Sequence, residues 1–434
     1  MTEEQKKIYE ALMAYCESHK DRPFVPRELV AHMEPVFKEM GFRGEALPEE
    51  RHRILAVKDD AAGDFVLFSP FLRELRRLYP KAHITLFGSD RNEELAKCCP
   101  YIDNLLVKNL EKEVGPFWEM FPILARQAVD YFVPYHFELG FCSCVGLNTP
   151  GLLLMYMGGV NRRVSYTQIR QDIHGRIKDA GWDAMLTVPV PFLLVRQSDT
   201  DRDLYLLEYL LQLPIADRHL ELWTLAADKE EAQRAVAPLL SSKGIRRIYT
   251  VMPCTSERFR EWPVERFVEM LKVIMEQEED LGLVIMGGLR DTSRAEALAK
   301  AFPGRALSLA GKIPFRVSAE VVGLTEKYIG ADTALMHIAA AKHVPVLTTF
   351  PFPADLQLHP LSMPFRFQPY KVPSVIVLPQ SAAGAQCRQL YGTGCAVTGE
   401  PHCILNISVE TMLKGYAYLG KRIEEQRLGA MVIK

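Results

Sequence analysis

The sequence has no apolar run long enough to cross a membrane. Its longest apolar stretch, Gly151–Val160, is far shorter than the roughly 20 residues that a spanning helix needs. The first residues, Met1–Lys7, are polar and lack the apolar core of a secretion signal. These absences argue against a membrane-spanning or secreted protein, and we expect the chain to be cytoplasmic.

Neither sign of charge is in surplus. The chain has 52 Lys and Arg against 54 Asp and Glu, a formal net charge of -2. A dedicated nucleic-acid binder usually carries a basic surplus, so the balance argues against that class. A chain of 434 residues that is 48% hydrophobic and 24% charged is typical of a globular protein with two domains of ordinary size.

The nine cysteines are an odd number spread along the chain, which indicates reduced thiols rather than a disulfide framework. Cys387, Cys395 and Cys403 recur at eight-residue steps with His402 beside the last, and these donors could hold a structural metal. The steps contain no tight Cys-Xaa-Xaa-Cys pair, and adjacent residues rarely ligate one ion. We therefore predict no metal and no cofactor, with this cluster as the weaker alternative.

Residues 1–50 read as a helical extension. Thr2 and Gln5 form a capping box at the start of an amphipathic helix that runs to His19. A second helix begins at Pro26, and Pro35 should break or kink it. We expect this extension to pack on a domain or on another subunit.

From Arg53 onward, short apolar runs alternate with helical patterns, which predicts βαβ units and parallel sheets. We expect one α/β domain over 51–225 and a second over 226–434, whose last helix could pack back on the first. The region 114–166 shows no regular pattern, and Leu220–Leu225 resembles a short strand. The other expected strands are Ile54–Val57, Ala82–Phe87, Asn104–Val107, Ile248–Met252, Leu281–Met286, Lys327–Gly330 and Val344–Phe350.

Two polar turns at expected strand ends carry candidate chemistry. After the first strand, Gly63 permits a tight turn and Asp64 could accept a proton, although a cap of the next helix is the simpler role for it. Later in the chain, Asp332 and Thr333 stand where a helix begins, with His337 one turn further. A helix N-terminus suits a phosphate, whereas the alternative is an ordinary crossover in which Asp332 and Thr333 only cap.

Two further turns offer donors for an anionic ligand. Thr255 and Ser256 supply hydroxyls, and Arg260 supplies a cation near the same strand end. The Gly287-Gly288 pair lets backbone approach a ligand, with Asp291 available for ribose hydroxyls. Each turn alone could equally be a solvated loop.

In this order and spacing, the turns resemble glycosyltransferase family 9, the ADP-heptose:lipopolysaccharide heptosyltransferases. The resemblance covers roughly 53–412. The matching elements are Gly63-Asp64, Arg260-Glu-Trp-Pro263, Leu309-Ala-Gly-Lys312 and Asp332–Ala340.

The resemblance implies a GT-B architecture, in which two Rossmann-like domains face a central cleft and the C-terminal domain holds the sugar nucleotide. Asp64 would correspond to the general base that activates the acceptor hydroxyl, with Gly63 beside it on the acceptor side. The donor-binding positions would be Thr255, Ser256, Arg260, Asp291, Ile313, Asp332, Thr333, Ala334 and His337.

The chain departs from the family pattern at three places. Ala334 replaces the glycine after Asp-Thr, Arg260 replaces the usual lysine before Trp-Pro, and Ala61-Ala62 replaces small hydroxyl residues before Gly-Asp. Each change bears on the sugar, the base or the activity. Outside the family motifs, Arg162 and Arg163 could meet an anionic acceptor, with a solvated turn as the alternative.

The sequence therefore predicts an inverting, metal-independent glycosyltransferase that moves heptose from ADP-heptose to a lipopolysaccharide-core or other bacterial surface-glycan acceptor. Expected partners are a nucleotide-diphosphate sugar, a saccharide or lipid-linked acceptor, the inner face of the cytoplasmic membrane, and a second copy bound through the N-terminal helices. Two alternatives remain. A non-catalytic sugar-nucleotide binder or assembly protein fits Ala61, Ala62 and Ala334, whereas an epimerase or dehydrogenase would need the Gly-Xaa-Gly-Xaa-Xaa-Gly turn that this chain lacks after its first strand.

Overall fold

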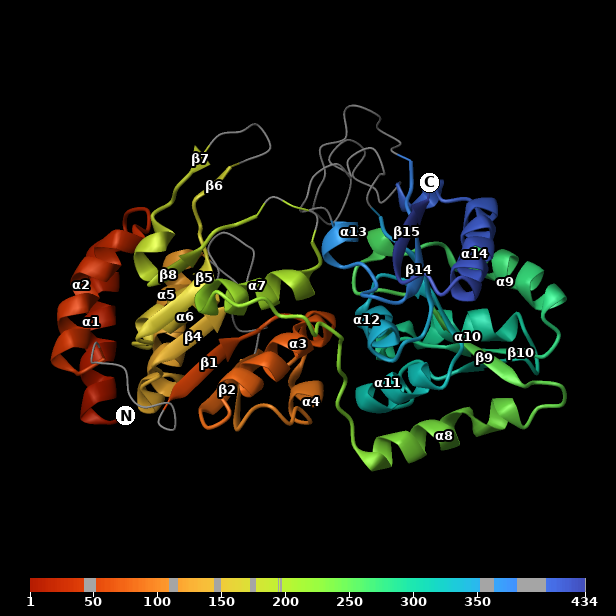
Figure 1. Ribbon diagram of the computed structural model, residues 1–434, viewed down its shortest axis with the longest axis horizontal. Helices are drawn as coiled ribbons and strands as arrows, with labels where there is room; N and C mark the ends of the chain where they lie inside the picture. Colours follow the sequence, from red (N-terminus) through yellow and green to blue (C-terminus); the bar gives the residue numbers. More distant parts are fainter. Residues whose placement is uncertain are drawn as a thin grey trace. The chain divides into compact units, whose positions relative to one another are not determined.

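The computed structural model describes residues 1–42, 52–108, 116–143, 150–171, 177–193, 195, 197–351, 363–380 and 403–433 (Figure 1). The chain forms two compact units. The first comprises Met1–Ala61, Pro70–Leu193 and Thr200–Arg218, and the second comprises Ala62–Ser69, Leu194–Asp199 and His219–Lys434. Two short segments from the first half of the chain therefore pack with the second unit.

The first unit is built on a six-stranded sheet in the order β3-β2-β1-β4-β5-β8, and every neighbouring pair is parallel. Both neighbours of β1 are in register with Ile54, which pairs with Ile84 on one side and Leu139 on the other. The strand order thus reverses beside β1, as in a Rossmann fold. The strands are β1 (Arg53–Val57), β2 (His83–Ser89), β3 (Asn104–Lys108), β4 (Leu139–Cys142), β5 (Arg162–Tyr166) and β8 (Val188–Val190).

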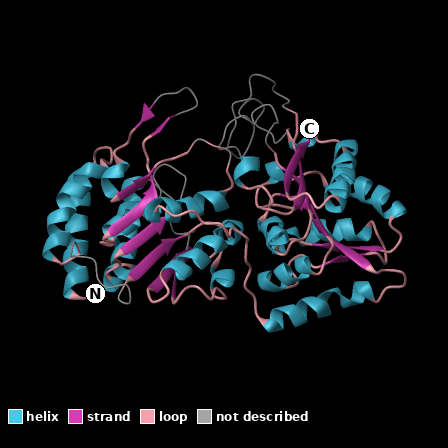
Figure 2. Cartoon of the chain, viewed as in Figure 1, coloured by secondary structure: helices cyan, strands magenta, loops and turns pink. Residues whose placement is uncertain are grey.

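Helices cover the strands of this sheet (Figure 2). They are α3 (Ala62–Leu78), whose first turns belong to the second unit, α4 (Glu93–Ala96), α5 (Phe117–Tyr131), α6 (Pro150–Met157) and α7 (Asp199–Leu211), with 3-10 turns at Val133–Tyr135 and Trp182–Met185. A small antiparallel pair, β6 (Arg170–Gln171) and β7 (Ile177–Lys178), extends from it.

The region 114–166, where the sequence shows no regular pattern, contains α5, β4, α6 and β5. Helix α6 has no polar face, because every residue from Gly151 to Met157 is buried. A helix that is apolar on all sides has no 3.6-residue periodicity to detect, and it lies inside the protein. Among the described helices, none has the length and apolar character needed to cross a bilayer.

The N-terminal extension forms α1 (Glu3–His19) and α2 (Pro26–Glu39), and the predicted capping box of Thr2 and Gln5 is confirmed. Both helices pack within the first unit, α1 against α5 and α2 against the Trp182–Met185 turn. Ile8, Leu12 and Tyr15 are fully buried there. The apolar faces expected to bind a second subunit are therefore already covered by this chain.

Of the two effects expected of Pro35, a break or a kink in the second helix, the break does not occur, because α2 continues to Glu39. Proline removes one intrahelical hydrogen bond at a cost of roughly 3 kcal/mol. Met33 and Phe37 flank it and are fully buried. Burial of two such side chains contributes about 1.5–3 kcal/mol each, which offsets the loss.

The second unit contains seven parallel strands in the order β11-β10-β9-β12-β13-β14-β15. This order also reverses beside the first strand, between β9 and β12. The strands are β9 (Arg247–Met252), β10 (Leu281–Ile285), β11 (Ala306–Ser308), β12 (Lys327–Ala331), β13 (Val346–Thr349), β14 (Pro373–Val377) and β15 (Gly429–Ile433).

The helices of this unit are α8 (Ala226–Leu240), α9 (Val264–Gln277), α10 (Thr292–Lys300), α11 (Phe315–Gly323), α12 (Ala334–Ala341), α13 (Met363–Arg366) and α14 (Val409–Glu424), with 3-10 turns at Arg258–Arg260, Leu289–Asp291 and Ile404–Asn406. The sequence prediction missed β11, β14 and β15. It was wrong for Leu220–Leu225, which forms no strand. The last helix, α14, packs on α9, β13 and β14 of its own unit.

A network of hydrogen bonds ties α14 to the amino-terminal edge of this sheet. The ammonium of Lys327 donates to the hydroxyls of Tyr249 and Tyr416, at 2.6 and 2.8 Å. Both tyrosines donate in turn to the carboxylate of Glu278. Burial alone would raise the pKa of Glu278, but the hydrogen bonds from Tyr416 and Tyr249 hold it below its ordinary value.

We expect Tyr416→Phe to lower the free energy of unfolding of the second unit by about 1–3 kcal/mol, because it deprives Glu278 and Lys327 of a partner in a partly buried site. Scanning calorimetry measures the change. The matched control is Tyr418→Phe, which removes the hydroxyl of an exposed tyrosine on the same helix and should leave the transition in place. Equal melting of the two variants would contradict the importance of the network.

Candidate functional site

The strand order of the second unit brings two predicted turns together. β9 and β12 are neighbours, so the loops that follow them leave the same edge of the sheet. Open α/β sheets bind ligands at such a reversal, outside the carboxyl ends of the strands. Arg260, from the loop after β9, forms an ion pair with the buried carboxylate of Asp332, which directly follows β12. Its Nη2 also donates to the Asp332 carbonyl at 2.8 Å.

The start of α12 is open. Thr333 occupies the N-cap position, but its side chain makes no capping hydrogen bond. Its hydroxyl lies 3.1 Å from that of buried Tyr328, which donates to the Ala331 carbonyl at 2.8 Å. The simpler role expected for Asp332 and Thr333, as side-chain caps of this helix, is therefore wrong. The first amides of α12 remain available to an anion.

His337 lies in the first turn of α12 and is only 4% exposed. Its Nε2 is 3.9 Å from a carboxylate oxygen of Asp332, and its ring meets Phe367 edge-on. Its Nδ1 is buried without a hydrogen-bond partner among the described residues. Burial lowers the pKa of His337 below its ordinary value, with Asp332 opposing the shift, so the imidazole is neutral at pH 7.

The Gly63-Asp64 turn lies against this helix. A Cβ at Gly63 would be 2.9 Å from Cδ2 of His337 and 3.2 Å from Cα of Ala334, so only glycine allows the first turn of α3 to approach so closely. Asp64 is the third residue of α3, whose N-cap is Ala61 without a side-chain cap. The alternative of Asp64 as the N-cap is therefore wrong, and its partly exposed carboxylate stands in the first turn of a helix beside α12.

Two of the other predicted donor-binding residues, Thr255 and Asp291, form hydrogen bonds within their own loops. The Thr255 hydroxyl closes its own turn, because it donates to the Glu257 carbonyl at 2.6 Å and accepts from the Glu257 amide at 3.1 Å. Ser256 is exposed on the same turn. Asp291 accepts from the Gly288 amide at 2.9 Å, so the carboxylate expected to bind ribose is held by its own loop.

Ile313 is half-buried in the loop after β11. That loop meets the β10 loop through Gly311, whose amide donates to the Gly287 carbonyl at 3.1 Å. The two loops therefore leave the sheet side by side. The loop after β10 neighbours the loop after β9, which carries Arg260.

Arg162 and Arg163 lie at the amino-terminal end of β5, away from the edge where parallel sheets build their sites. Arg163 is 3% exposed and its guanidinium donates to the carbonyls of Val160, Asn161 and Met185. This geometry argues against contact between Arg163 and an anionic acceptor. Arg162 is exposed at the same edge.

Of the residues named as the weaker metal-binding alternative, Cys387, Cys395 and His402 lie outside the described residues. Cys403 is half-buried.

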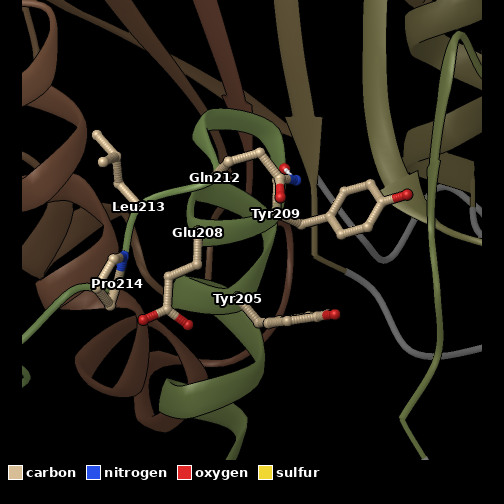
Figure 3. A pocket seen from close by; sticks show the side chains of 6 residues that line it. All are labelled: Tyr205, Glu208, Tyr209, Gln212, Leu213 and Pro214. Carbon is tan, nitrogen blue, oxygen red and sulfur yellow. Dashed lines mark hydrogen bonds between the residues drawn. The ribbon is translucent and has the colours of Figure 1, made fainter.

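A shallow cavity of about 410 Å³ lies in the first unit, at the end of α7. Tyr205, Tyr209, Gln212 and Leu213 line it with Pro214 and Glu208 (Figure 3). The Glu208 carboxylate is engaged by the Ile215 amide at 2.7 Å and by Arg218. None of the predicted site residues lines this cavity.

Sequence reasoning missed Tyr328 and Glu261. Tyr328 lies in an apolar strand pattern, which gives no sign that its hydroxyl donates to the Ala331 carbonyl in the turn before α12. Glu261 precedes Trp262 within the Arg260–Pro263 element, and its carboxylate accepts from the Thr255 amide at 2.9 Å. A carboxylate inside a basic motif is the signal that could have revealed its role.

Residues 196–377 match the family model of glycosyltransferase family 9 (heptosyltransferase). The Gly63-Asp64 turn lies outside the matched stretch. No protein of curated function matches the chain in sequence.

Solved structures share the fold over most of the chain. The glycosyl transferase family 9 protein from Veillonella parvula DSM 2008 aligns with a TM-score of 0.64 and 18% identity, over 87% of this chain and 100% of its own. E. coli ADP-heptose lps heptosyltransferase II aligns with a TM-score of 0.56 and 15% identity, over 86% of this chain and 99% of its own. E. coli heptosyltransferase WaaC with ADP aligns with a TM-score of 0.55 and 13% identity, over 86% of this chain and 99% of its own. At these identities the likeness concerns the fold.

Two Rossmann-like units of the GT-B type, together with the matched stretch, define a glycosyltransferase. Residues 196–377, less than half of the chain, resemble in sequence the heptosyltransferases of glycosyltransferase family 9.

The neutral state of His337 predicts a pH dependence of stability. Its pKa is lowered in the folded protein, whereas the unfolded chain takes up a proton near the ordinary value of about 6.5. The free energy of unfolding should therefore fall as pH drops below about 6.5, by up to about 1.4 kcal/mol at pH 5.5. Urea unfolding of the wild type and His337→Gln at pH 7.5 and 5.5 measures this. The variant should lose less on acidification, and an equal loss would contradict the prediction.

Proposed function

We propose that this protein is an inverting, metal-independent glycosyltransferase that uses a nucleotide-diphosphate sugar, with ADP-heptose as the donor. Among the solved structures with this fold are an E. coli ADP-heptose lps heptosyltransferase and the E. coli heptosyltransferase WaaC with ADP. The observation that carries the proposal is the meeting of Arg260, the open N-terminus of α12 and the Gly63-Asp64 turn.

The donor half of the site suits a diphosphate leaving group. Breaking a glycosyl–phosphate bond leaves negative charge on the diphosphate, which needs hydrogen-bond donors fixed in advance. The backbone amides at the start of α12, which no side chain caps, and the guanidinium of Arg260 would supply such donors without a metal ion. The ion pair with Asp332 holds Arg260 beside this turn, and Thr333 is the N-cap residue of α12.

The acceptor half depends on Asp64. In our proposal its carboxylate takes the proton of the acceptor hydroxyl as that oxygen attacks the anomeric carbon and the diphosphate departs from the opposite face. Asp64 belongs to the same packed unit as α12, and Gly63 touches the first turn of that helix, so base and leaving group would share one site. The acceptor would be a lipopolysaccharide-core precursor or another bacterial surface glycan, met at the inner face of the cytoplasmic membrane.

Asp64→Asn should reduce sugar transfer at least about 100-fold, because an amide cannot take up the proton. Binding of ADP, measured by calorimetry, should change little. Normal turnover by the variant would refute the assigned base. A wild-type protein that binds the donor but neither hydrolyses nor transfers it would instead support the non-catalytic sugar-nucleotide binder.

Arg260→Met should weaken ADP binding by about 10–100-fold, since a charged hydrogen bond is lost and the Asp332 carboxylate is left facing the diphosphate. Arg258→Met is the matched control, because Arg258 lies exposed on the same 3-10 turn. Calorimetric titration of both variants with ADP measures the difference. The same affinity in both would contradict a role of Arg260 in donor binding.

A further inference from the structure

One guanidinium joins two loops that border the candidate donor site. Arg294, on α10, forms an ion pair with Glu261 in the loop after β9. Its Nη2 also donates to the carboxylate of Asp291, in the loop after β10, at 2.6 Å. The planar guanidinium presents a rigid fork of donors, which suits a bridge between two carboxylates.

Each of the two carboxylates also accepts a hydrogen bond from a backbone amide. Glu261 accepts from the Thr255 amide and Asp291 accepts from the Gly288 amide, both at 2.9 Å. A continuous series of hydrogen bonds therefore runs from the turn that carries Thr255 to the Gly287-Gly288 turn through Arg294. Because the series ends on main-chain groups at both sides, it sets where the two turns lie relative to each other.

The two carboxylates that Arg294 contacts lie beside Cys254, and these three residues also have the composition of a metal site. Ligand atoms of Cys254, Glu261 and Asp291 all lie within 4.8 Å of one another. Zinc would need the thiolate form of the cysteine. Burial raises the pKa of the Cys254 thiol to about 12, with Asp291 and Glu261 adding to the rise and Arg294 opposing it. The cation between the two carboxylates is already supplied by Arg294, whose guanidinium contacts both Glu261 and Asp291.

We propose that Arg294 is a positioning residue for the donor site, which holds the turns after β9 and β10 at the separation that a nucleoside diphosphate requires. This inference rests on the proposed donor and deepens it. Arg294 does not touch the reacting atoms, so its loss should act on donor binding more than on the chemical step.

Arg294→Met, Arg294→Lys and a matched control, Arg290→Met, test the role. Arg290 is an exposed residue of the same loop region. Calorimetry should show ADP binding at least about tenfold weaker in Arg294→Met and partly restored in Arg294→Lys, which keeps the charge but not the fork. Kinetically, the KM for the donor should rise while kcat changes less. Arg290→Met should match the wild type.

A readout without ligand separates this inference from the proposed function. Amide hydrogen exchange of the peptides that contain Thr255 and Gly288 should be faster in Arg294→Met than in Arg290→Met. If the wild type binds ADP and Arg294→Met binds it with the same affinity, the positioning role is overturned, as it is by unchanged exchange. Stoichiometric zinc binding by the wild type at these residues also overturns it. A wild type that binds no nucleoside diphosphate overturns the proposed function, while the exchange result still decides whether Arg294 holds the loops.

Discussion

The pairing of Arg260 with Asp332 is the interaction on which the candidate site depends. It exists because the strand order of the second sheet reverses between β9 and β12, so that two loops distant in sequence leave the sheet side by side. The pair is largely shielded from water, which makes its attraction stronger than that of a surface ion pair and the loss of either partner costly. Everything assigned to the donor half is arranged around it.

The charges of the donor half of this site are nearly balanced before any ligand arrives. Arg260 and Asp332 cancel, and His337 is held neutral by burial. What remains for an anion is the set of backbone amides at the start of α12 and the Nε of Arg260, which has no partner among the described residues. In the proposed function, such a site would attract a diphosphate through oriented dipoles more than through net charge.

The sequence was informative where local pattern and tertiary role agree. Apolar runs predict β1, β9, β10 and β12 because these strands are buried on both faces, and the turns after them were found for the same reason. α6 was invisible because it is apolar on every side. The roles of individual polar groups were harder to predict. Sequence does not show that Asp291 is held by the Gly288 amide, or that Arg163 is buried among carbonyls, since both facts depend on neighbours supplied by folding.

The contact of Gly63 with His337 has a consequence for how the protein is made. At typical synthesis rates the ribosome adds residues around Gly63 on the order of tens of seconds before it reaches His337. The first turn of α3 therefore has to wait for α12 before it finds its packing partner, although the strand preceding it can already join its own sheet. During this interval the apolar residues of Ala62–Ser69 lack the partners that bury them in the folded second unit.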